Sequence, residues 1–172
     1  TCTTSTKTTI DSNDDVGWYS SIAIGTNGNP IISYRDNTDI YLGVTNLDLK
    51  IAVCNNPTCE VLGGAPASTN TTIDSAGDVG AWASIAIGTN GNPIISYSDL
   101  TNSGLKVAAC NNPTCTTSTN TTIDSNGVVG EYTSIAIGTN GNPIISYLDN
   151  TNEDLKVAAC NNPTCTTSTN TT

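Results

Sequence analysis

The sequence predicts an all-β protein built from tandem four-stranded antiparallel blades, β-propeller-like, with about three blades in 172 residues. Three observations lead to this fold class. The string SIAIGTNGNPIISY begins at Ser21, Ser84 and Ser134, so the chain repeats itself. Each copy holds an Asn-Gly dipeptide between two apolar runs, which indicates a tight β-hairpin. No stretch shows the periodicity of an amphipathic helix.

We expect one repeat array over residues 1–172, with approximate repeats at 3–59, 66–115 and 116–165 and a further repeat starting at 166–172. Additional residues in the first repeat lie between Tyr34 and Lys50 and after Cys59, at turns where insertions are tolerated. Residues 71–122 and 121–172 differ at nine of 52 positions, in two patches that we expect to be exposed loops or edges.

Each repeat divides into four short strands. TTSTNTTIDS is rich in β-branched threonine and suits an outer, half-exposed strand. SIAIG follows, then the TNGN turn, and PIISY returns with proline tolerated at its first position. LKVAAC is the fourth strand and ends at a cysteine loop. SIAIG and KVAAC are small and apolar on both faces, which favours strands covered on each side by neighbouring blades. A β-solenoid and a chain of separate small β-domains are the alternatives.

Cysteines occur in pairs that enclose Asn-Asn-Pro-Thr: Cys54 with Cys59, Cys110 with Cys115, and Cys160 with Cys165. A compact turn of this kind brings two cysteines within disulfide distance, and disulfides imply an oxidising compartment. The alternative is a four-thiolate metal site. Cys2 has no partner five residues before it, so we expect its disulfide partner outside this chain.

One N-x-[ST] sequon occurs in each repeat at the same phase, at Asn70, Asn120 and Asn170. These sites predict glycosylation, and the alternative is ordinary β-strand composition. An aromatic residue precedes each SIAIG strand, and we assign Trp18, Trp82 and Tyr132 to one repeat phase. Such residues could stack on a pyranose ring, or they could pack against the next blade's turn.

Asp11, Asn13 and Asp15 have the spacing that opens a calcium loop, but no bidentate glutamate follows. The alternative is that Asp11, Asp74 and Asp124 are solvated turn residues that cap local backbone amides. A second acidic turn follows each tyrosine and does not match an Asp-box pattern. Apart from this weak calcium candidate, we expect no metal and no cofactor.

Composition excludes several function classes. The chain has no histidine, so histidine-based triads and zinc sites are impossible. Its net charge is −10 and its five basic residues are scattered, which argues against nucleic acid and anionic lipid as partners. No apolar run is long enough to span a bilayer, so we expect no membrane insertion.

The string SIAIGTNGNPIISYLDNTNEDLKVAAC resembles a repeat of secreted and surface-attached microbial proteins. In that repeat a serine, an alternating apolar strand, a Gly-Asn/Asp-Gly turn, a P-x-I-S-Y strand, an acidic turn and D-L-K-V-A-x-C recur. The resemblance covers nearly all of the chain. It implies a propeller-like, extracellular, multi-blade protein and no catalytic residue.

These observations predict an extracellular or cell-surface structural and adhesive protein that is not an enzyme. Three blades are too few to close a ring, so we expect copies of the chain, or adjoining repeats of a longer chain, to continue the array. The alternative is a lectin-like carbohydrate-binding propeller. A sialidase-like hydrolase is the weakest candidate, because Arg35 is the only arginine.

Overall fold

The computed structural model describes residues 6–13, 15–38 and 47–172, and these form twelve β-strands. The strands are β1 (Val16–Ile24), β2 (Pro30–Asp36), β3 (Asp48–Cys54), β4 (Ser68–Asp74), β5 (Val79–Ile87), β6 (Pro93–Asp99), β7 (Gly104–Cys110), β8 (Ser118–Asp124), β9 (Val129–Ile137), β10 (Pro143–Asp149), β11 (Asp154–Cys160) and β12 (Ser168–Thr171). Within the described ranges, no helix is long and apolar enough to cross a bilayer.

The strands form three four-stranded antiparallel sheets: a first sheet of β1–β4, a second of β5–β8 and a third of β9–β12. This confirms the all-β class and the tandem arrangement of four-stranded units. The sheets are offset by one strand from the expected sequence repeats. The threonine-rich strand completes the sheet before it, since β4 pairs with β3 from Cys54↔Ser68 to Leu49↔Asp74.

The Asn-Gly turns connect the first two strands of every sheet, as predicted. Gly28, Gly91 and Gly141 each have φ near +81°, a conformation that glycine adopts without steric cost. In the first of these turns the amide of Gly28 donates to the carbonyl of Gly25 over 2.9 Å. The turn residues therefore fix the register of the following strand.

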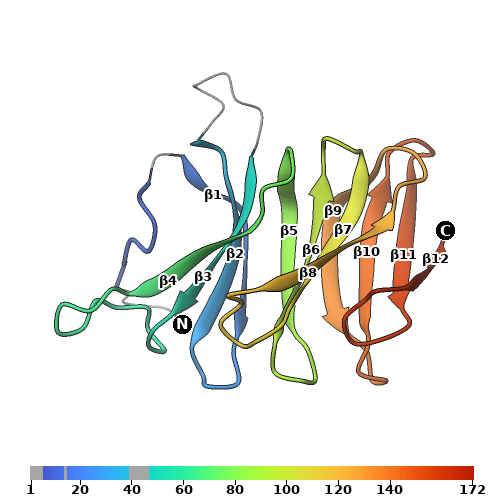
Figure 1. Ribbon diagram of the computed structural model, residues 1–172. Coiled ribbons are helices and arrows are strands. Elements are labelled where there is room, and N and C mark those ends of the chain that lie inside the picture. The colour runs from blue at the N-terminus through green and yellow to red at the C-terminus, as the bar shows by residue number, and fades with distance from the viewer. Residues whose placement is uncertain (1–5, 14, 39–46) are drawn as a thin grey trace.

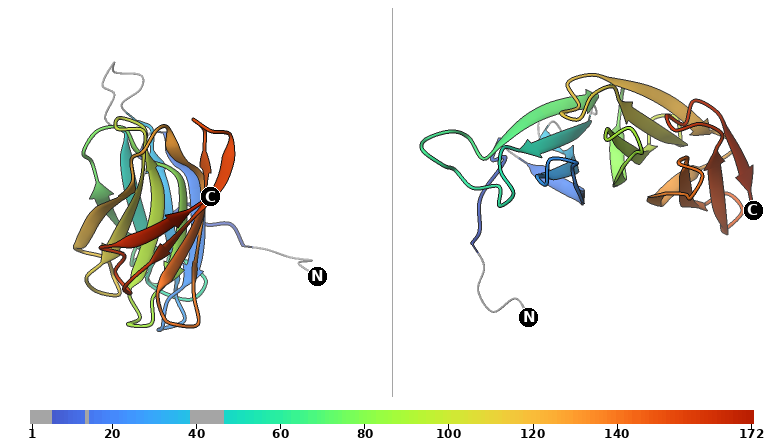
Figure 2. Two further views of the ribbon diagram at one scale, coloured as in Figure 1. Left: turned by 90° about the vertical axis from the view of Figure 1, so that its right-hand side faces the viewer. Right: turned by 90° about the horizontal axis from the view of Figure 1, so that it is seen from below.

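The three sheets stand face to face along an arc (Figures 1 and 2). The first strands β1, β5 and β9 line the concave side, whereas β4, β8 and β12 lie on the convex side. The first and third sheets form the two ends of the arc. The described strands close neither a barrel nor a ring.

Two apolar cores lie between the sheets. Each sheet has a leading face, directed at the sheet before it, and a trailing face, directed at the sheet after it. The first core joins the trailing face of the first sheet to the leading face of the second, and includes Ile31, Leu49, Ile51, Val53, Val79, Ile85, Ile95 and Tyr97. The second core repeats this contact and includes Ile94, Leu105, Val107, Val129, Ile135, Ile145 and Tyr147.

Close approach between sheets depends on a glycine in the first strand of the following sheet. A Cβ added at Gly130 would lie 2.7 Å from the Cα of Leu105, and one added at Gly80 would lie 2.9 Å from the Cα of Leu49. The nearby variable positions are not loops or edges throughout: Ala81 and Ala83 are buried in β5. Part of the sequence variation therefore lies inside an inter-sheet contact.

Candidate functional site

Every repeat holds a lysine between two aspartates beneath a tyrosine, and we call this group the inter-sheet network. In the second repeat, Nζ of Lys106 lies 2.6 Å from Oδ2 of Asp74 and 3.8 Å from Oδ2 of Asp99. The hydroxyl of Tyr97 donates to the same Oδ2 of Asp74 over 2.7 Å. Lys106 also lies over the Tyr97 ring, 5.7 Å from its centroid. One carboxylate thus accepts from two side chains at once.

The network connects neighbouring sheets. Asp74 is the last residue of β4 in the first sheet, whereas Tyr97 and Lys106 belong to β6 and β7 of the second. The third repeat reproduces the arrangement: Asp124, at the end of β8, accepts from Lys156 over 2.6 Å and from Tyr147 over 2.7 Å. A buried polar link therefore accompanies the apolar contact at both inter-sheet interfaces.

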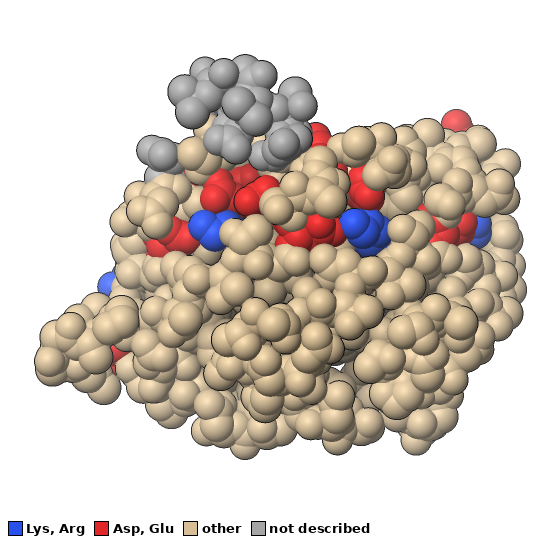
Figure 3. Space-filling view, viewed as in Figure 1, with Lys and Arg blue, Asp and Glu red and all other residues tan. Residues whose placement is uncertain are grey.

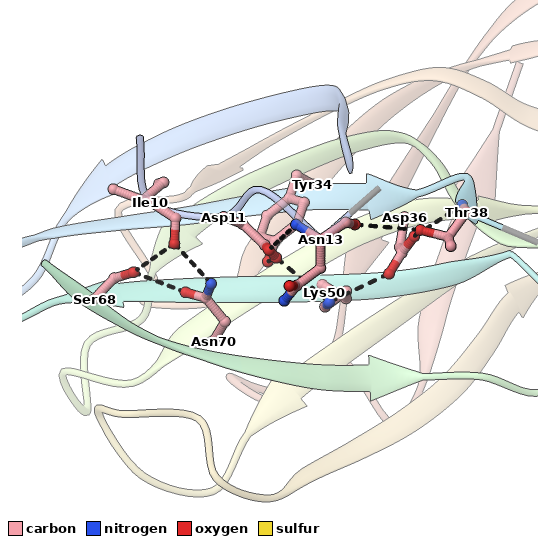
Figure 4. A network of polar contacts seen from close by, with 9 residues as sticks. All are labelled: Ile10, Asp11, Asn13, Tyr34, Asp36, Thr38, Lys50, Ser68 and Asn70. Atoms are coloured by element: carbon pink, nitrogen blue, oxygen red, sulfur yellow. Dashed lines mark hydrogen bonds and ion pairs between the residues drawn. The ribbon is translucent and has the colours of Figure 1, made fainter. Parts of the chain in front are cut away.

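The same arrangement occurs ahead of the first sheet (Figure 4). Asp11 accepts from the hydroxyl of Tyr34 over 2.6 Å and lies 3.4 Å from Lys50, which also bonds Asp36 over 3.2 Å. The neighbouring carbonyl of Ile10 accepts hydrogen bonds from Ser68 and Asn70 of β4. Ile10 and Asp11 therefore take the positions that Ile73 and Asp74, the last two residues of β4, take in front of the second sheet.

Electrostatics explain why these aspartates remain charged inside the fold. Burial acts to raise the pKa of Asp74, but the hydrogen bonds from Lys106 and Tyr97 outweigh it, and the pKa lies below its usual value. Burial and the adjacent Asp74 carboxylate raise the pKa of Tyr97. Figure 3 shows the charged side chains as a band across the sheets, with a largely uncharged surface below it. These ion pairs link each sheet to the one before it.

The acidic turns do cap backbone amides, as one of the two interpretations predicts. Oδ1 of Asp11, Asp74 and Asp124 accepts the amide two residues later, over 3.2, 3.0 and 3.0 Å. They are not solvated, because Asp74 and Asp124 are buried. The calcium candidate consists of groups with other partners: Asp11 bonds Tyr34, and Asp15 accepts from the indole of Trp18 over 2.8 Å. Among the described residues no cluster of three or more His, Cys, Asp or Glu could hold a metal.

Three disulfides close the Asn-Asn-Pro-Thr loops, as predicted: Cys54–Cys59, Cys110–Cys115 and Cys160–Cys165. Their Cα atoms are 5.1, 4.9 and 4.9 Å apart, which suits a disulfide. The four-thiolate metal site is therefore wrong for these six cysteines. Disulfides at this density are typical of an oxidising environment. Cys2 lies outside the described residues.

An aromatic ladder runs along the first strands of the three sheets. The rings of Tyr19, Trp82 and Tyr132 lie in a row, with centroids 5.2 Å apart at each step and planes tilted by 43° and 49°. All three residues have φ near +50°, at irregularities in the strand register. The assignment of Trp18 to this phase is wrong, since counting back from Ser21 gives Tyr19. The ladder residues contact one another.

The sequon asparagines take part in contacts between outer strands. Nδ2 of Asn70, Asn120 and Asn170 donates to the carbonyl of Ile10, Ile73 and Ile123, respectively, over 2.9, 3.0 and 3.1 Å. Each of these bonds reaches from one outer strand to the segment in front of it. Glycosylation at the three sites stays a prediction.

Shallow hollows lie on the two uncovered faces at the ends of the stack. The leading face of the first sheet has one of about 280 Å³, lined by Ile10, Asp11, Val16, Gly17, Ser20, Ile32 and Tyr34. The trailing face of the third sheet has one of about 250 Å³, lined by Ser134, Ile135, Ala136, Ile144, Ser146 and Val157. Their acidic member, Asp11, is already bound to Tyr34 and Lys50. Neither hollow combines groups for acid–base or nucleophilic chemistry.

The network lysines were missed in the sequence, where the basic residues look scattered. Their spacing could have identified them, because Lys50, Lys106 and Lys156 occupy the same position of the repeat. One lysine per repeat at a fixed position, with an aspartate at two further fixed positions, would have predicted the ion pairs.

No family model and no curated protein matches this chain. A crystal structure of a protein of unknown function from Dyadobacter fermentans DSM 18053 is similar, with a TM-score of 0.65 and 11% sequence identity. The match covers 87% of this chain and 39% of that protein, so the chain spans well under half of its length. At this identity the likeness concerns the fold alone.

Proposed function

We propose that the chain is an extracellular structural and adhesive repeat protein with propeller-like blades, a building unit of a surface filament or of a long surface protein. The observation that carries the proposal is the inter-sheet contact, which recurs with apolar residues at equivalent positions and with the same polar network at each step. Its charged groups stabilise the stacking of sheets. Repetition of one contact adds length, whereas an enzyme needs a single site.

Several properties belong to this proposal. We infer an extracellular or cell-surface location from the disulfides and the sequons, no catalytic activity, and no nucleic-acid partner or membrane insertion. The partners are copies of the chain or adjoining repeats of a longer chain. Intact-mass measurement on native material tests chain length, disulfides and glycans together: a mass matching a reduced, unmodified chain would contradict the disulfides and the glycosylation.

Electron microscopy of native material tests the structural role. We expect fibres, or long surface projections, whose repeat along the axis follows the stacking of sheets. Discrete particles with no elongated form would refute the filament.

A lectin-like module is the second candidate, and the exposed aromatic ladder favours it. Aromatic faces stack on sugar rings, and the ladder presents Tyr19, Trp82 and Tyr132 in a row. A glycan array with the wild type and a triple alanine variant of these three residues separates the candidates. Trp18→Ala is the matched control, because Trp18 is an exposed aromatic at the first strand but outside the ladder. Sugar binding that the triple variant loses and the control keeps would establish the lectin.

A further inference from the structure

We propose that copies of this chain associate head to tail, with the trailing face of the third sheet of one copy packed on the leading face of the first sheet of the next. This inference deepens the proposed structural function and rests on it. A second copy is the partner that fits each uncovered face, because the chain already makes the same contact twice within itself. The two terminal faces carry residues at the same repeat positions as those internal contacts, but no sheet covers them.

The leading face of the first sheet is exposed where its equivalents are buried. Ile22 is 61% exposed, whereas Ile85 and Ile135 at the same repeat position are 6% and 8% exposed. Both equivalents pack on the trailing face of the sheet before them. Ile22 thus presents an apolar side chain where the fold elsewhere places a neighbouring sheet.

The trailing face of the third sheet is likewise exposed where its equivalents are buried. Leu155 is 73% exposed, whereas its equivalents Leu49 and Leu105 are fully buried. Ile144 is 44% exposed, and its equivalent Ile94 is buried at 2%. The apolar residues that each internal interface covers are therefore uncovered at this end.

Shape at the two faces is complementary in the same way as inside the chain. Added Cβ atoms at Gly80 and Gly130 would collide with the backbone of the leucine-bearing strand in front, but one at Gly17 would meet nothing within 4 Å. Gly17 has φ of +93°, close to that of its equivalents. The first sheet therefore holds a glycine ready to approach Leu155 of another copy.

Polar groups of the internal contact are duplicated as well. The amide of Ile135 donates to Oγ of Ser84 over 3.2 Å, and the equivalent pair across copies is the amide of Ile22 with Oγ of Ser134. The amide of Val129 donates to the carbonyl of Ser103 over 3.0 Å.

The matching acceptor for the next copy is the carbonyl of Glu153. Glu153 has φ of +59°, and Ser103, its equivalent, has φ of +56°. The corresponding donor is the amide of Val16, the equivalent of Val129. The acceptor's backbone already has the conformation that the internal contact uses.

Residue identity completes the match. The trailing face of the third sheet repeats that of the second at five apolar positions of the second core, with Ala136, Ile144, Leu155, Val157 and Ala159 in place of Ala86, Ile94, Leu105, Val107 and Ala109. A contact between unlike faces is heterologous, so it builds either a closed ring or an open filament. Both arrangements use the same two faces.

Sedimentation velocity over a range of concentrations tests the proposal with the full chain and two variants. Ile22→Asp alters only the leading face of the stack and Leu155→Asp alters only the trailing face. Both side chains are exposed in the single chain, so both variants should fold, which circular dichroism checks. Val61→Asp is the matched control, since Val61 is an exposed apolar residue in the loop before β4.

We expect the wild type and V61D to self-associate, and I22D and L155D each to stay monomeric, with affinity reduced on the order of 100-fold. An equimolar mixture of I22D and L155D should form a dimer and nothing larger, because the one intact face of each fits the other. A wild type that remains monomeric, an L155D that still self-associates, or a mixture that stays monomeric would overturn the proposal.

The outcomes separate this inference from the proposed function. A wild type that stops at a closed two-copy ring supports the head-to-tail contact and contradicts the filament. Fibres that form equally from I22D and L155D leave the structural function standing and overturn the assignment of these faces.

Discussion

Replacing Asp74 by asparagine should destabilise the fold by about 3 kcal/mol, because it leaves the Lys106 ammonium, whose side chain is only 12% exposed, with a single carboxylate at 3.8 Å. Asp74 now provides the acceptor at 2.6 Å for Lys106 and at 2.7 Å for Tyr97. Loss of one partner of a buried ion pair typically costs about 3–5 kcal/mol, and the remaining Asp99 places this site at the lower end. The change corresponds to a more than hundredfold shift in the folding equilibrium.

Urea denaturation under non-reducing conditions measures this effect. Asp154→Asn is the control, because it removes the same charge from an exposed position of β11 and should change stability by less than about 0.5 kcal/mol. Tyr97→Phe removes only the hydroxyl bond and should cost about 1.5 kcal/mol. Equal midpoints for D74N and D154N would refute the view that the network holds the sheets together.

Three further predictions concern pH, the disulfides and the glycines. Burial acts to raise the pKa of the network aspartates, but hydrogen bonding outweighs it and lowers their pKa in the folded state. Stability should therefore be full above about pH 4 and should fall as the pH drops through the pKa values of the folded state. Burial raises the pKa of the network tyrosines, so stability should also fall above about pH 10, where tyrosines of the unfolded chain ionise before those of the folded chain. Thermal melts from about pH 2 to 11 measure both effects, and a melting temperature that does not change over this range would contradict both pKa shifts. Replacing Cys110 and Cys115 by serine should cost about 2 kcal/mol in chemical denaturation, and no change in midpoint would show that the loop is held by its other bonds. Gly130→Ala should lower the free energy of unfolding of the monomer by about 1–3 kcal/mol more than Gly17→Ala does. Both substitutions place alanine at a positive φ, but only the one at position 130 brings a Cβ against the Leu105 backbone. Equal losses of stability would exclude the close contact.

Local patterns in the sequence were sufficient to predict the strands. Asn-Gly turns require positive φ, and small apolar residues on both faces require two covering layers, so the hairpins and the stacking followed from residue types alone. The grouping of strands into sheets did not follow. The segment at 68–74 pairs with the strand before it, and its composition carries no information on which neighbour it joins.

The polar network lies beyond what local patterns predict, because its members are far apart in the chain. Lys106 bonds Asp74 across 32 positions and across two sheets. The first member of the aromatic ladder was predicted wrongly for a different reason. Trp18 was chosen by residue type, whereas the register counted from Ser21 places Tyr19 at the position of Trp82. Equivalence in a repeat follows spacing, and a bulge directs adjacent side chains to different sides.

A cryo-electron microscopy reconstruction of the assembled chain, at a resolution that shows side chains, would show directly how copies meet. We expect sheets stacked without interruption across the boundary between copies, with Leu155 of one copy against Gly17 of the next as Leu105 lies against Gly130 within the chain. An assembly in which both terminal faces stay in contact with solvent, or in which copies meet through their outer strands, would contradict it.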